Sequence, residues 1–427
     1  MARVESPGRR GVLVAGAALF ASTLDARANG APATAPKVVV VGGGYGGATA
    51  ARYLRLWSGG TIAVTLIERE LAFVSCPLSN LVIGGSRQLA DITIAYDGLE
   101  KLGVRRIRGD AVGIDPSARI VRLAQGESLP YDRLILAPGV DFIYDRIPGL
   151  GSPAAQALVP HAWKAGSQTV ALRARLEAMR DGGVFAMHVP RAPYRCPPAP
   201  YERACQVASY FARHKPKSKV IILDANEEVQ SKKALFLAAW SGRYNGYVEY
   251  RPNSELVDVD PASLTIKLDF EDVSADVINV IPPQRAGSIA RQLGIANANG
   301  SFCEVDFLSY ESTAQKNIHV LGDAIQVAPL MPKSGHMANQ HGKVCAAAVV
   351  ALLLGKEINP SPVIANACYS YISDGEVAHI ASVHAYDRAQ RTMLVVPGSG
   401  GLSPAANAAE LAYAEAWARS IWFDTLG

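Results

Sequence analysis

The chain has 427 residues, of which 49% are hydrophobic and 19% are charged, a composition that excludes a disordered chain. This length exceeds one simple core, so two or three domains are expected. The formal net charge is +4, and half of it comes from the first 28 residues, where four arginines face Glu5 and Asp25. The remaining charge is too small for a nucleic-acid-binding surface, and no nucleic-acid partner is expected.

The first 28 residues have the features of an export signal. Arg9 and Arg10 precede a mildly apolar run, residues 11–21, and residues 26–28 offer small residues for cleavage. The run is too short to span a bilayer. Paired arginines before a weakly hydrophobic run predict the twin-arginine route, and an ordinary secretory signal is the alternative. We therefore expect a periplasmic mature chain without a transmembrane segment.

The first predicted unit after the signal is a strand, a helix and a second strand. A strand of buried type, residues 37–41, runs into the glycine-rich sequence of residues 42–47. An alanine-rich helix follows at about residues 46–57, and a second strand covers residues 61–67. This order indicates a doubly wound parallel sheet.

The glycine spacing in this unit predicts a dinucleotide site. Gly42 permits a tight turn, Gly44 lets the backbone approach a pyrophosphate, and Gly47 lets the helix pack closely on the strand. The N-terminus of the helix supplies N–H groups and a positive partial charge to the phosphates. Glu68, directly after the second strand, is placed to accept both hydroxyls of an adenosine ribose. The expected ligand is a dinucleotide without a 2′-phosphate.

Two later segments indicate that this dinucleotide is FAD. Residues 131–139, which end at Gly139, resemble the middle segment of flavoproteins that have two dinucleotide-binding domains. Residues 313–323 end in Gly322 and Asp323, and in that class the aspartate contacts the ribitol chain of the flavin. The predicted fold class is therefore α/β, a glutathione-reductase-like, Rossmann-type flavoprotein with two dinucleotide-binding domains and a C-terminal interface domain.

The order of these segments makes the FAD-binding domain discontinuous. Residues 1–28 are assigned to the signal peptide, 37–149 and 290–358 to the FAD-binding domain, and 150–289 to a second Rossmann-like domain. Residues 359–427 form the C-terminal interface domain, whose tyrosines and tryptophans suit either a cap on the core or a partner surface.

The second domain lacks the expected nucleotide loop. After a strand at residues 183–189, the place of a glycine-rich turn is taken by residues 190–200, which contain five prolines and no glycine. Because proline has no N–H group to offer a phosphate, this domain is not expected to bind a nicotinamide nucleotide. The loop holds Cys196 instead, and the neighbouring Arg195 is expected to favour its thiolate form.

Residues 195–204, with the sequence Arg-Cys-Pro-Pro-Ala-Pro-Tyr-Glu-Arg-Ala, resemble the active-site loop of the flavoprotein subunit of flavocytochrome c sulfide dehydrogenase. Residues 160–166, 281–287 and 331–334 resemble that family too, and the similarity runs over essentially the whole mature chain. The resemblance implies a heterodimer with a c-type cytochrome subunit. The implied activity is the oxidation of hydrosulfide with transfer of the electrons to the cytochrome.

The resemblance also implies roles for four residues. Cys76 matches the cysteine that is bonded to the 8α-methyl group of FAD, and a buried structural cysteine is the alternative. Cys196 and Cys368 match a redox disulfide beside the flavin, for which a structural disulfide is the alternative. Glu202 matches an acid near that disulfide that can move protons, with a helix-terminal acid as the alternative.

In the expected reaction hydrosulfide attacks the disulfide and leaves a cysteine persulfide. Arg195, Arg203 and Lys333 are the candidates for attracting the anion. Two alternatives stay open: a sulfide:quinone reductase-like enzyme, and a flavin-bearing scaffold subunit with little turnover.

The other three cysteines have no predicted role, and no cysteine pair has the spacing of metal ligands. They are Cys205, Cys303 and Cys345. A second group of residues that bind soft metals lies near the last flavin segment, where ordinary packing is the alternative to a copper site. Its members are Met331, His336, Met337 and His341.

Overall fold

The computed structural model describes residues 35–427. The predicted twin-arginine signal and its cleavage site therefore lie outside the described residues. Within residues 35–427, no helix combines the length and the apolar character needed to cross a membrane.

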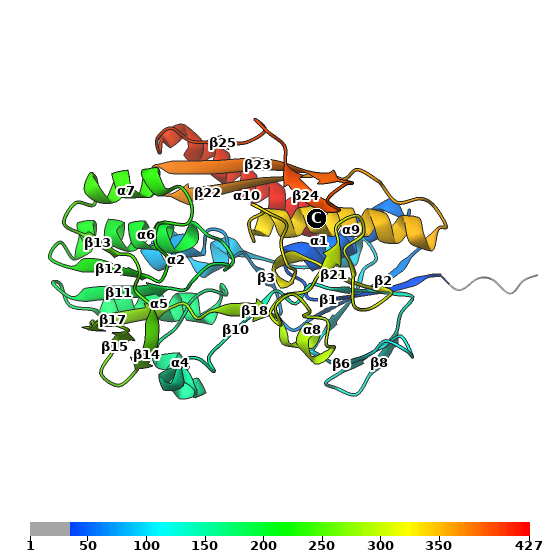
Figure 1. Ribbon diagram of the computed structural model, residues 1–427, viewed down its shortest axis with the longest axis horizontal. Coiled ribbons are helices and arrows are strands. Elements are labelled where there is room, and N and C mark those ends of the chain that lie inside the picture. Colours follow the sequence, from blue (N-terminus) through cyan, green and yellow to red (C-terminus); the bar gives the residue numbers. More distant parts are fainter. Residues whose placement is uncertain (1–34) are drawn as a thin grey trace, which may run out of the picture. The chain divides into compact units, whose positions relative to one another are not determined.

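A seven-stranded sheet carries the glycine-rich turn, with the strand order β19-β20-β21-β9-β1-β2-β5 (Figure 1). The five strands from β21 to β5 are parallel, as the alternation of strand and helix predicts, whereas β19 and β20 add an antiparallel edge. The strands are β1 (Lys37–Val41), β2 (Ala63–Glu68), β5 (Arg105–Arg108), β9 (Arg133–Leu136), β19 (Val305–Asp306), β20 (Glu311–Ser312) and β21 (Ile318–Val320).

Two long helices pack closely beside this sheet. Helix α1 (Tyr45–Trp57) follows β1, and α9 (Gly335–Leu353) packs against it. Gly342 permits this close approach, because any side chain at this position would collide with the carbonyl oxygen of Gly46. The four valines of β1 are all buried, and full burial of each valine side chain stabilises the fold by about 1.5–3 kcal/mol.

Short elements connect the strands of the first sheet. They include two small antiparallel sheets, two short α-helices and three 3₁₀ turns. The elements are β3 (Phe73–Val74), α2 (Ser79–Gly84), β4 (Thr93–Ile94), α3 (Asp97–Lys101), β6 (Ala111–Asp115), β7 (Ile120–Leu123), β8 (Ser128–Pro130) and the 3₁₀ turns Leu89–Ile92, Pro148–Leu150 and Gly322–Ala324.

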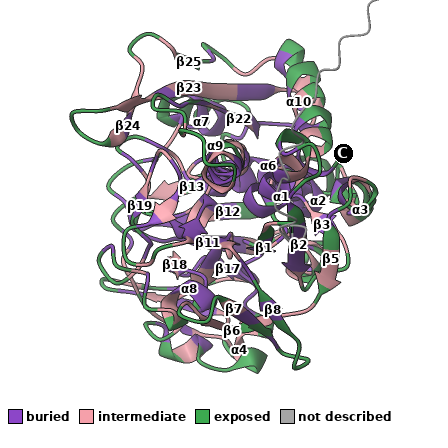
Figure 2. Ribbon diagram, turned by 90° about the vertical axis from the view of Figure 1, so that its right-hand side faces the viewer, coloured by how far each residue is buried: buried purple, intermediate pink, exposed green. Residues whose placement is uncertain are grey.

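A second parallel sheet, with the order β13-β12-β11-β17, lies in the segment between β9 and β21. The chain enters and leaves this segment through the antiparallel pair β10–β18. In Figure 2 the central strands of both parallel sheets are largely buried. The elements of this segment are β10 (Val140–Phe142), α4 (Pro153–Leu158), α5 (Ser167–Ala178), β11 (Val184–Val189), α6 (Ala199–His214), β12 (Lys219–Asp224), α7 (Lys233–Ser241), β13 (Val248–Arg251), β14 (Leu256–Asp260), β15 (Thr265–Leu268), β16 (Asp272–Ser274), β17 (Val277–Val280), β18 (Gln284–Ala286) and α8 (Ser288–Gln292).

The C-terminal segment adds an antiparallel sheet that packs on α6 and α9 (Figure 1). The Gln206 side chain on α6 donates to the carbonyl oxygen of Tyr371, and Asn339 on α9 donates to Asp424. The first bond fixes the strand that carries Cys368 against the helix that follows Cys196, and the second joins α9 to the C-terminal helix. The elements are β22 (Val363–Tyr371), β23 (Val377–Asp387), β24 (Thr392–Val395), β25 (Gly401–Leu402) and α10 (Ala408–Leu426).

Candidate active site

Of the three glycines to which the sequence assigns a role in the turn after β1, two are tightly packed and one is open. A side chain at Gly42, whose φ is +98°, would collide with the carbonyl oxygen of Ala137, and one at Gly47 would collide with the carbonyl oxygen of Gly42. At Gly44 an added Cβ would meet no atom within 4 Å. The turn therefore presents bare backbone to open space at Gly44, as the approach of a phosphate group requires.

This turn borders a cavity of about 510 Å³. The cavity brings together six of the eight residues predicted to bind the cofactor, while Gly42 and Gly47 lie outside its lining and shape the turn. The six lining residues are Gly44, Glu68, Cys76, Gly139, Gly322 and Asp323.

Two carboxylates in the cavity fit the hydroxyl groups of a dinucleotide. Glu68 accepts hydrogen bonds from the backbone N–H groups of Gly43 at 2.6 Å and Glu70 at 2.9 Å, which hold it at the end of β2. The Oδ1 atom of Asp323 is buried and has no hydrogen-bond partner. Because an unpartnered buried acceptor costs about 1–3 kcal/mol, this oxygen is suited to a ligand hydroxyl such as one on a ribitol chain.

Arg195 points at Cys76, not at Cys196. Its Nη2 atom donates to the Sγ of Cys76 at 3.0 Å and also to the carbonyl oxygen of Trp163, and its Nη1 atom lies 3.7 Å from Asp323. Burial raises the pKa of the Cys196 thiol, the nearby Cys368 and Glu202 raise it further, and Arg195 offsets only part of this. Arg195 therefore favours the Cys196 thiolate, as expected, but it does not outweigh the effect of burial on the pKa of this thiol.

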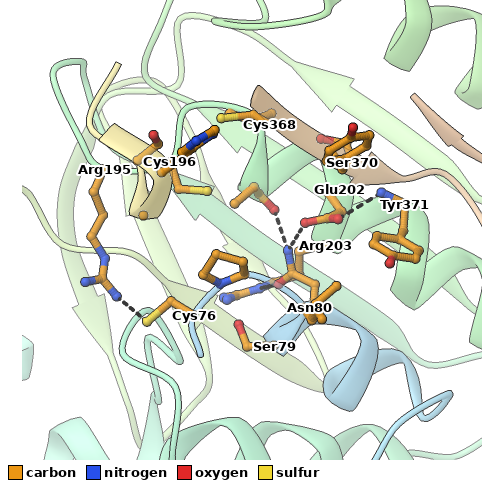
Figure 3. A pocket seen from close by; sticks show the side chains of 18 of the residues that line it. Cys76, Ser79, Asn80, Arg195, Cys196, Glu202, Arg203, Cys368, Ser370 and Tyr371 are labelled. Carbon is orange, nitrogen blue, oxygen red and sulfur yellow. Dashed lines mark hydrogen bonds between the residues drawn. The ribbon is translucent and has the colours of Figure 1, made fainter. Parts of the chain in front are cut away.

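A second, smaller cavity of about 70 Å³ adjoins the first (Figure 3). Cys76 and Cys196 line both cavities, whereas Cys368 lines only the smaller one. All three carry free thiols in this structure, so the expected bond between Cys196 and Cys368 is not formed here. Cys196 lies in the loop before α6 with a left-handed φ of 57°, and its N–H group donates to the carbonyl oxygen of Lys333 at 2.7 Å.

Glu202 lies in the first turn of α6 and lines the smaller cavity (Figure 3). One carboxylate oxygen accepts from the backbone N–H of Tyr371 at 2.9 Å, and the other accepts from the side chain of Asn80 at 2.7 Å. Burial raises the pKa of Glu202, although these two bonds work against the shift. A carboxyl group whose pKa is raised holds its proton to a higher pH than an exposed glutamate and can act as a proton donor or acceptor.

The other two proposed anion-attracting cations are already bound within the protein. The buried guanidinium group of Arg203 donates to the carbonyl oxygens of His161 and Ala162 and to the side chains of Asn80 and Asn279. Lys333 donates to the backbone carbonyl oxygens of Asp323 and Ile325. These bonds hold the walls of the site together, and the role of the two charges in attracting the anion stays a prediction.

The residues considered for copper do not gather at one point. His336 lines the smaller cavity and accepts a hydrogen bond from the backbone N–H of Ala367, whereas His341 is buried against the ring of Tyr310. Among residues 35–427 no group of three or more His, Cys, Asp or Glu side chains is arranged to hold a metal. Cys205, Cys303 and Cys345 are buried free thiols outside both cavities.

The end of the second sheet is closed by tyrosines. Asp224, the last residue of β12, accepts hydrogen bonds from the hydroxyl groups of Tyr201 at 2.7 Å and Tyr250 at 3.1 Å and from Asn226. In a nicotinamide dinucleotide site of this fold, an acid at the end of this strand accepts hydrogen bonds from the ribose hydroxyls of the nucleotide. Sequence reasoning missed this residue, although its place at a strand end was a usable signal. Asn80, which donates to Glu202, and Lys232, which donates to the carbonyl oxygen of Cys368 beside the Cys196–Cys368 pair (the dithiol), had no such signal.

Family models match three parts of the chain. Residues 169–282 match the central region of the sulfide dehydrogenase [flavocytochrome c] flavoprotein chain, residues 360–426 match its flavin-binding region, and residues 36–174 match pyridine nucleotide-disulphide oxidoreductases. The flavoprotein chain of this dehydrogenase from Chlorobaculum thiosulfatiphilum is 59% identical over 46 residues, which are 11% of this chain and 94% of that sequence. The chain is therefore similar to sulfide-oxidising flavoproteins over these regions.

This flavoprotein family also includes the sulfide:quinone oxidoreductases. The mitochondrial enzyme of Mus musculus is 24% identical over 326 residues, 72% of this chain and 69% of its own. The crystal structure of the sulfide:quinone oxidoreductase from Aquifex aeolicus superposes with a TM-score of 0.74 at 18% identity, covering 92% of this chain and 91% of that one. These matches confirm the predicted α/β flavoprotein fold and an FAD-dependent sulfide oxidoreductase.

Proposed function

We propose that the chain oxidises hydrosulfide through a Cys196–Cys368 disulfide and passes the electrons through covalently bound FAD to a c-type cytochrome outside the cytoplasm. The observation that carries this proposal is the position of Cys196. It lines both the large cavity that fits FAD and the small cavity that contains Cys368. A disulfide formed here therefore connects the small cavity, where we propose that hydrosulfide binds, with the large cavity, where we propose that FAD binds.

The first step is a thiol–disulfide exchange at Cys368, the sulfur that lines only the small cavity. Hydrosulfide forms a bond to the Sγ of Cys368, the bond between Cys368 and Cys196 breaks, and the electron pair of that bond stays on Cys196 as a thiolate. The products are a Cys368 persulfide and a Cys196 thiolate, so the single negative charge of the substrate is conserved. Glu202 lies in the same cavity and takes the proton from the persulfide.

Bound FAD supplies an acceptor for two electrons. The thiolate of Cys196 faces the cavity that fits this cofactor, so the electron pair leaves the disulfide site on that side. A second hydrosulfide then bonds to the outer sulfur of the Cys368 persulfide, the S–S bond to Cys368 breaks, and its electron pair stays on Cys368 as a thiolate while a hydrodisulfide, the shortest polysulfide, leaves. Removal of two electrons from the Cys196 and Cys368 thiolates, for which bound FAD would supply the acceptor, re-forms the disulfide.

We propose that Cys76 is the residue bonded to the 8α-methyl group of the flavin. It lines the large cavity, and the Nη2 atom of Arg195 donates a hydrogen bond to its Sγ at 3.0 Å, which holds the sulfur in place beside a positive charge. A covalent bond prevents loss of the cofactor in a compartment that has no free FAD. The predicted export signal agrees with such a compartment.

A c-type cytochrome in a heterodimer is the proposed electron acceptor. Two features argue against a nicotinamide nucleotide at the second sheet: the proline-rich loop offers few N–H groups to a pyrophosphate, and Asp224 already accepts hydrogen bonds from two tyrosines. The names of the matching family models link this chain to flavocytochrome c. A quinone is the second candidate, because the longest alignments reported above are with sulfide:quinone oxidoreductases.

The proposal is tested by rapid mixing of the oxidised protein with sulfide. Cytochrome c or a short-chain quinone is then added to the reduced protein. We expect the flavin absorbance to bleach and to recover with cytochrome c. Cys368→Ser abolishes the bleaching but keeps the bound flavin, whereas Cys303→Ala, at a buried thiol outside both cavities, behaves as the wild type. Bleaching at an unchanged rate in Cys368→Ser contradicts the disulfide route, and recovery with quinone alone assigns the acceptor to the second candidate.

A further inference from the structure

Lys232 lies buried beside the dithiol and no part of the proposed mechanism uses it. Its side-chain ammonium donates to the carbonyl oxygen of Cys368 at 2.8 Å and to the hydroxyl of Ser370 at 2.7 Å. The residue is only 4% exposed to solvent. Lys232 directly precedes α7, so its side chain links the segment that contains α7 to strand β22, which carries Cys368.

The position of Lys232 is unfavourable for a lysine in three ways. Its φ of 54° places the backbone in the left-handed region, which costs a residue with a side chain about 1–3 kcal/mol. It precedes the N-terminus of α7, where the helix dipole opposes a positive charge. Its burial removes the ammonium from water. Strain and desolvation of this kind are typical of groups held in place for function.

The charges around Lys232 are those of the dithiol site. Burial lowers its pKa to about 8, while Cys368, Glu202, Cys196 and Glu410 of α10 act in the opposite direction. The ammonium is therefore protonated at neutral pH and faces groups that are, or become, negative.

The other two cations near the sulfurs are engaged elsewhere. Arg195 is turned to Cys76 and Asp323. Arg203, whose charge also faces Glu202 and Cys196, has its donors on backbone carbonyls and two asparagines. Lys232 is the cation whose hydrogen bonds reach the backbone of Cys368 itself.

We propose that Lys232 is a positioning residue that holds the Cys368 segment in place and supplies the buried positive charge that stabilises the thiolate set free when the Cys196–Cys368 disulfide opens. The proposal rests on the function proposed above. In the exchange step the negative charge of hydrosulfide enters a buried space and comes to rest on Cys196. Because burial and Glu202 both oppose a thiolate there, a cation must offset them. Lys232 also keeps Cys368 within reach of Cys196 as the bond between them opens and closes.

The test measures thiolate formation in the reduced, flavin-containing protein without any sulfide. Modification of Cys196 and Cys368 by methyl methanethiosulfonate is followed against pH by peptide mass. Lys232→Gln keeps a donor for Cys368 and Ser370 but loses the charge. We expect it to raise the pH midpoint of thiol modification by about one unit, which is about tenfold less thiolate at a given pH. Lys232→Arg is expected to keep the wild-type midpoint.

Lys233→Met is the matched control, because Lys233 is the next residue, is exposed and pairs only with Glu228 at the surface. It removes the same charge and must leave the midpoint unchanged. An unchanged midpoint in Lys232→Gln, or an equal shift in Lys232→Arg, overturns the proposal. Failure of sulfide to bleach the flavin of the wild type overturns the proposed function instead, so the two failures are distinguishable.

Discussion

The guanidinium group of Arg195 lies 3.0 Å from the Sγ of Cys76, although Arg195 is the sequence neighbour of Cys196. The two cysteines are thereby given different electrostatic surroundings. Cys76 has a cation at hydrogen-bonding distance, whereas the pKa of Cys196 is raised by burial. This difference separates the residue proposed to bind the cofactor from the residue proposed to exchange sulfur.

Substitution of Cys76 tests the covalent bond directly. Acid-precipitated wild-type protein is expected to keep its flavin in the pellet, and Cys76→Ala is expected to release it to the supernatant, as measured by visible absorbance. Cys368→Ser is the control that loses the proposed disulfide and keeps the acid-stable flavin. Acid-stable flavin in Cys76→Ala would show that another residue makes the bond.

Loss of the Arg195 charge should slow the formation of that bond. Arg195→Met removes the positively charged donor that lies 3.0 Å from the Cys76 sulfur. A hydrogen bond from a charged group contributes about 1.5–3 kcal/mol, so its loss should slow the attachment roughly tenfold or more. The time course of acid-stable flavin after FAD is added to apoprotein measures this effect. Arg191→Met removes an exposed arginine of the same loop that pairs with Glu255, and it should match the wild type. Equal rates in the two variants would remove Arg195 from the attachment reaction.

The protonation of Glu202 should appear in the pH dependence of sulfide-driven bleaching. Burial raises its pKa, so the carboxylate needed as a base forms at a higher pH than in an exposed glutamate. We expect the rate of bleaching in the wild type to rise with pH, in a limb that starts above about 4.3, the usual pKa of a glutamate. Glu202→Gln should lower the rate by about 10²–10⁴-fold and should lack this rise with pH (the acid limb).

The same shift has a consequence for stability. Because the folded-state pKa of Glu202 lies above the unfolded value, its contribution to stability is present at low pH and is lost as pH rises through the folded pKa. Wild type should therefore lose stability relative to Glu202→Gln over that interval, as measured by urea unfolding. Glu227→Gln, at an exposed glutamate, should reproduce the wild-type curves, and an acid limb that survives in Glu202→Gln would assign it to another group.

Two glycines of the same turn should respond differently to one methyl group. Gly44→Ala places its Cβ in open space, so the melting temperature of the apoprotein is unchanged while flavin content falls. Gly47→Ala drives its Cβ into the carbonyl oxygen of Gly42, so the fold itself loses about 1–3 kcal/mol. Calorimetry of the apoproteins and flavin content of the purified proteins separate the two effects. Full flavin content in Gly44→Ala would contradict the placement of the pyrophosphate.

Sequence determined the parts of this protein that depend on neighbours along the chain. The strand, the glycine turn, the helix and Glu68 form one local unit, whose steric rules can be read from residue types alone. The lack of glycine and the prolines before α6 likewise indicated a domain without a nucleotide loop. The family resemblance added the pairing of Cys196 with Cys368, which no spacing in the chain could supply.

Tertiary structure alone decided where the charges lie. Arg195 turns to Cys76, which is 119 residues away in the chain, and Arg203 is bound by the carbonyl oxygens of His161 and Ala162, about 40 residues away. Lys232 meets Cys368 only because the C-terminal sheet packs across the second domain. Electrostatic partners depend on distances in space between residues far apart in the chain, and local sequence does not fix those distances.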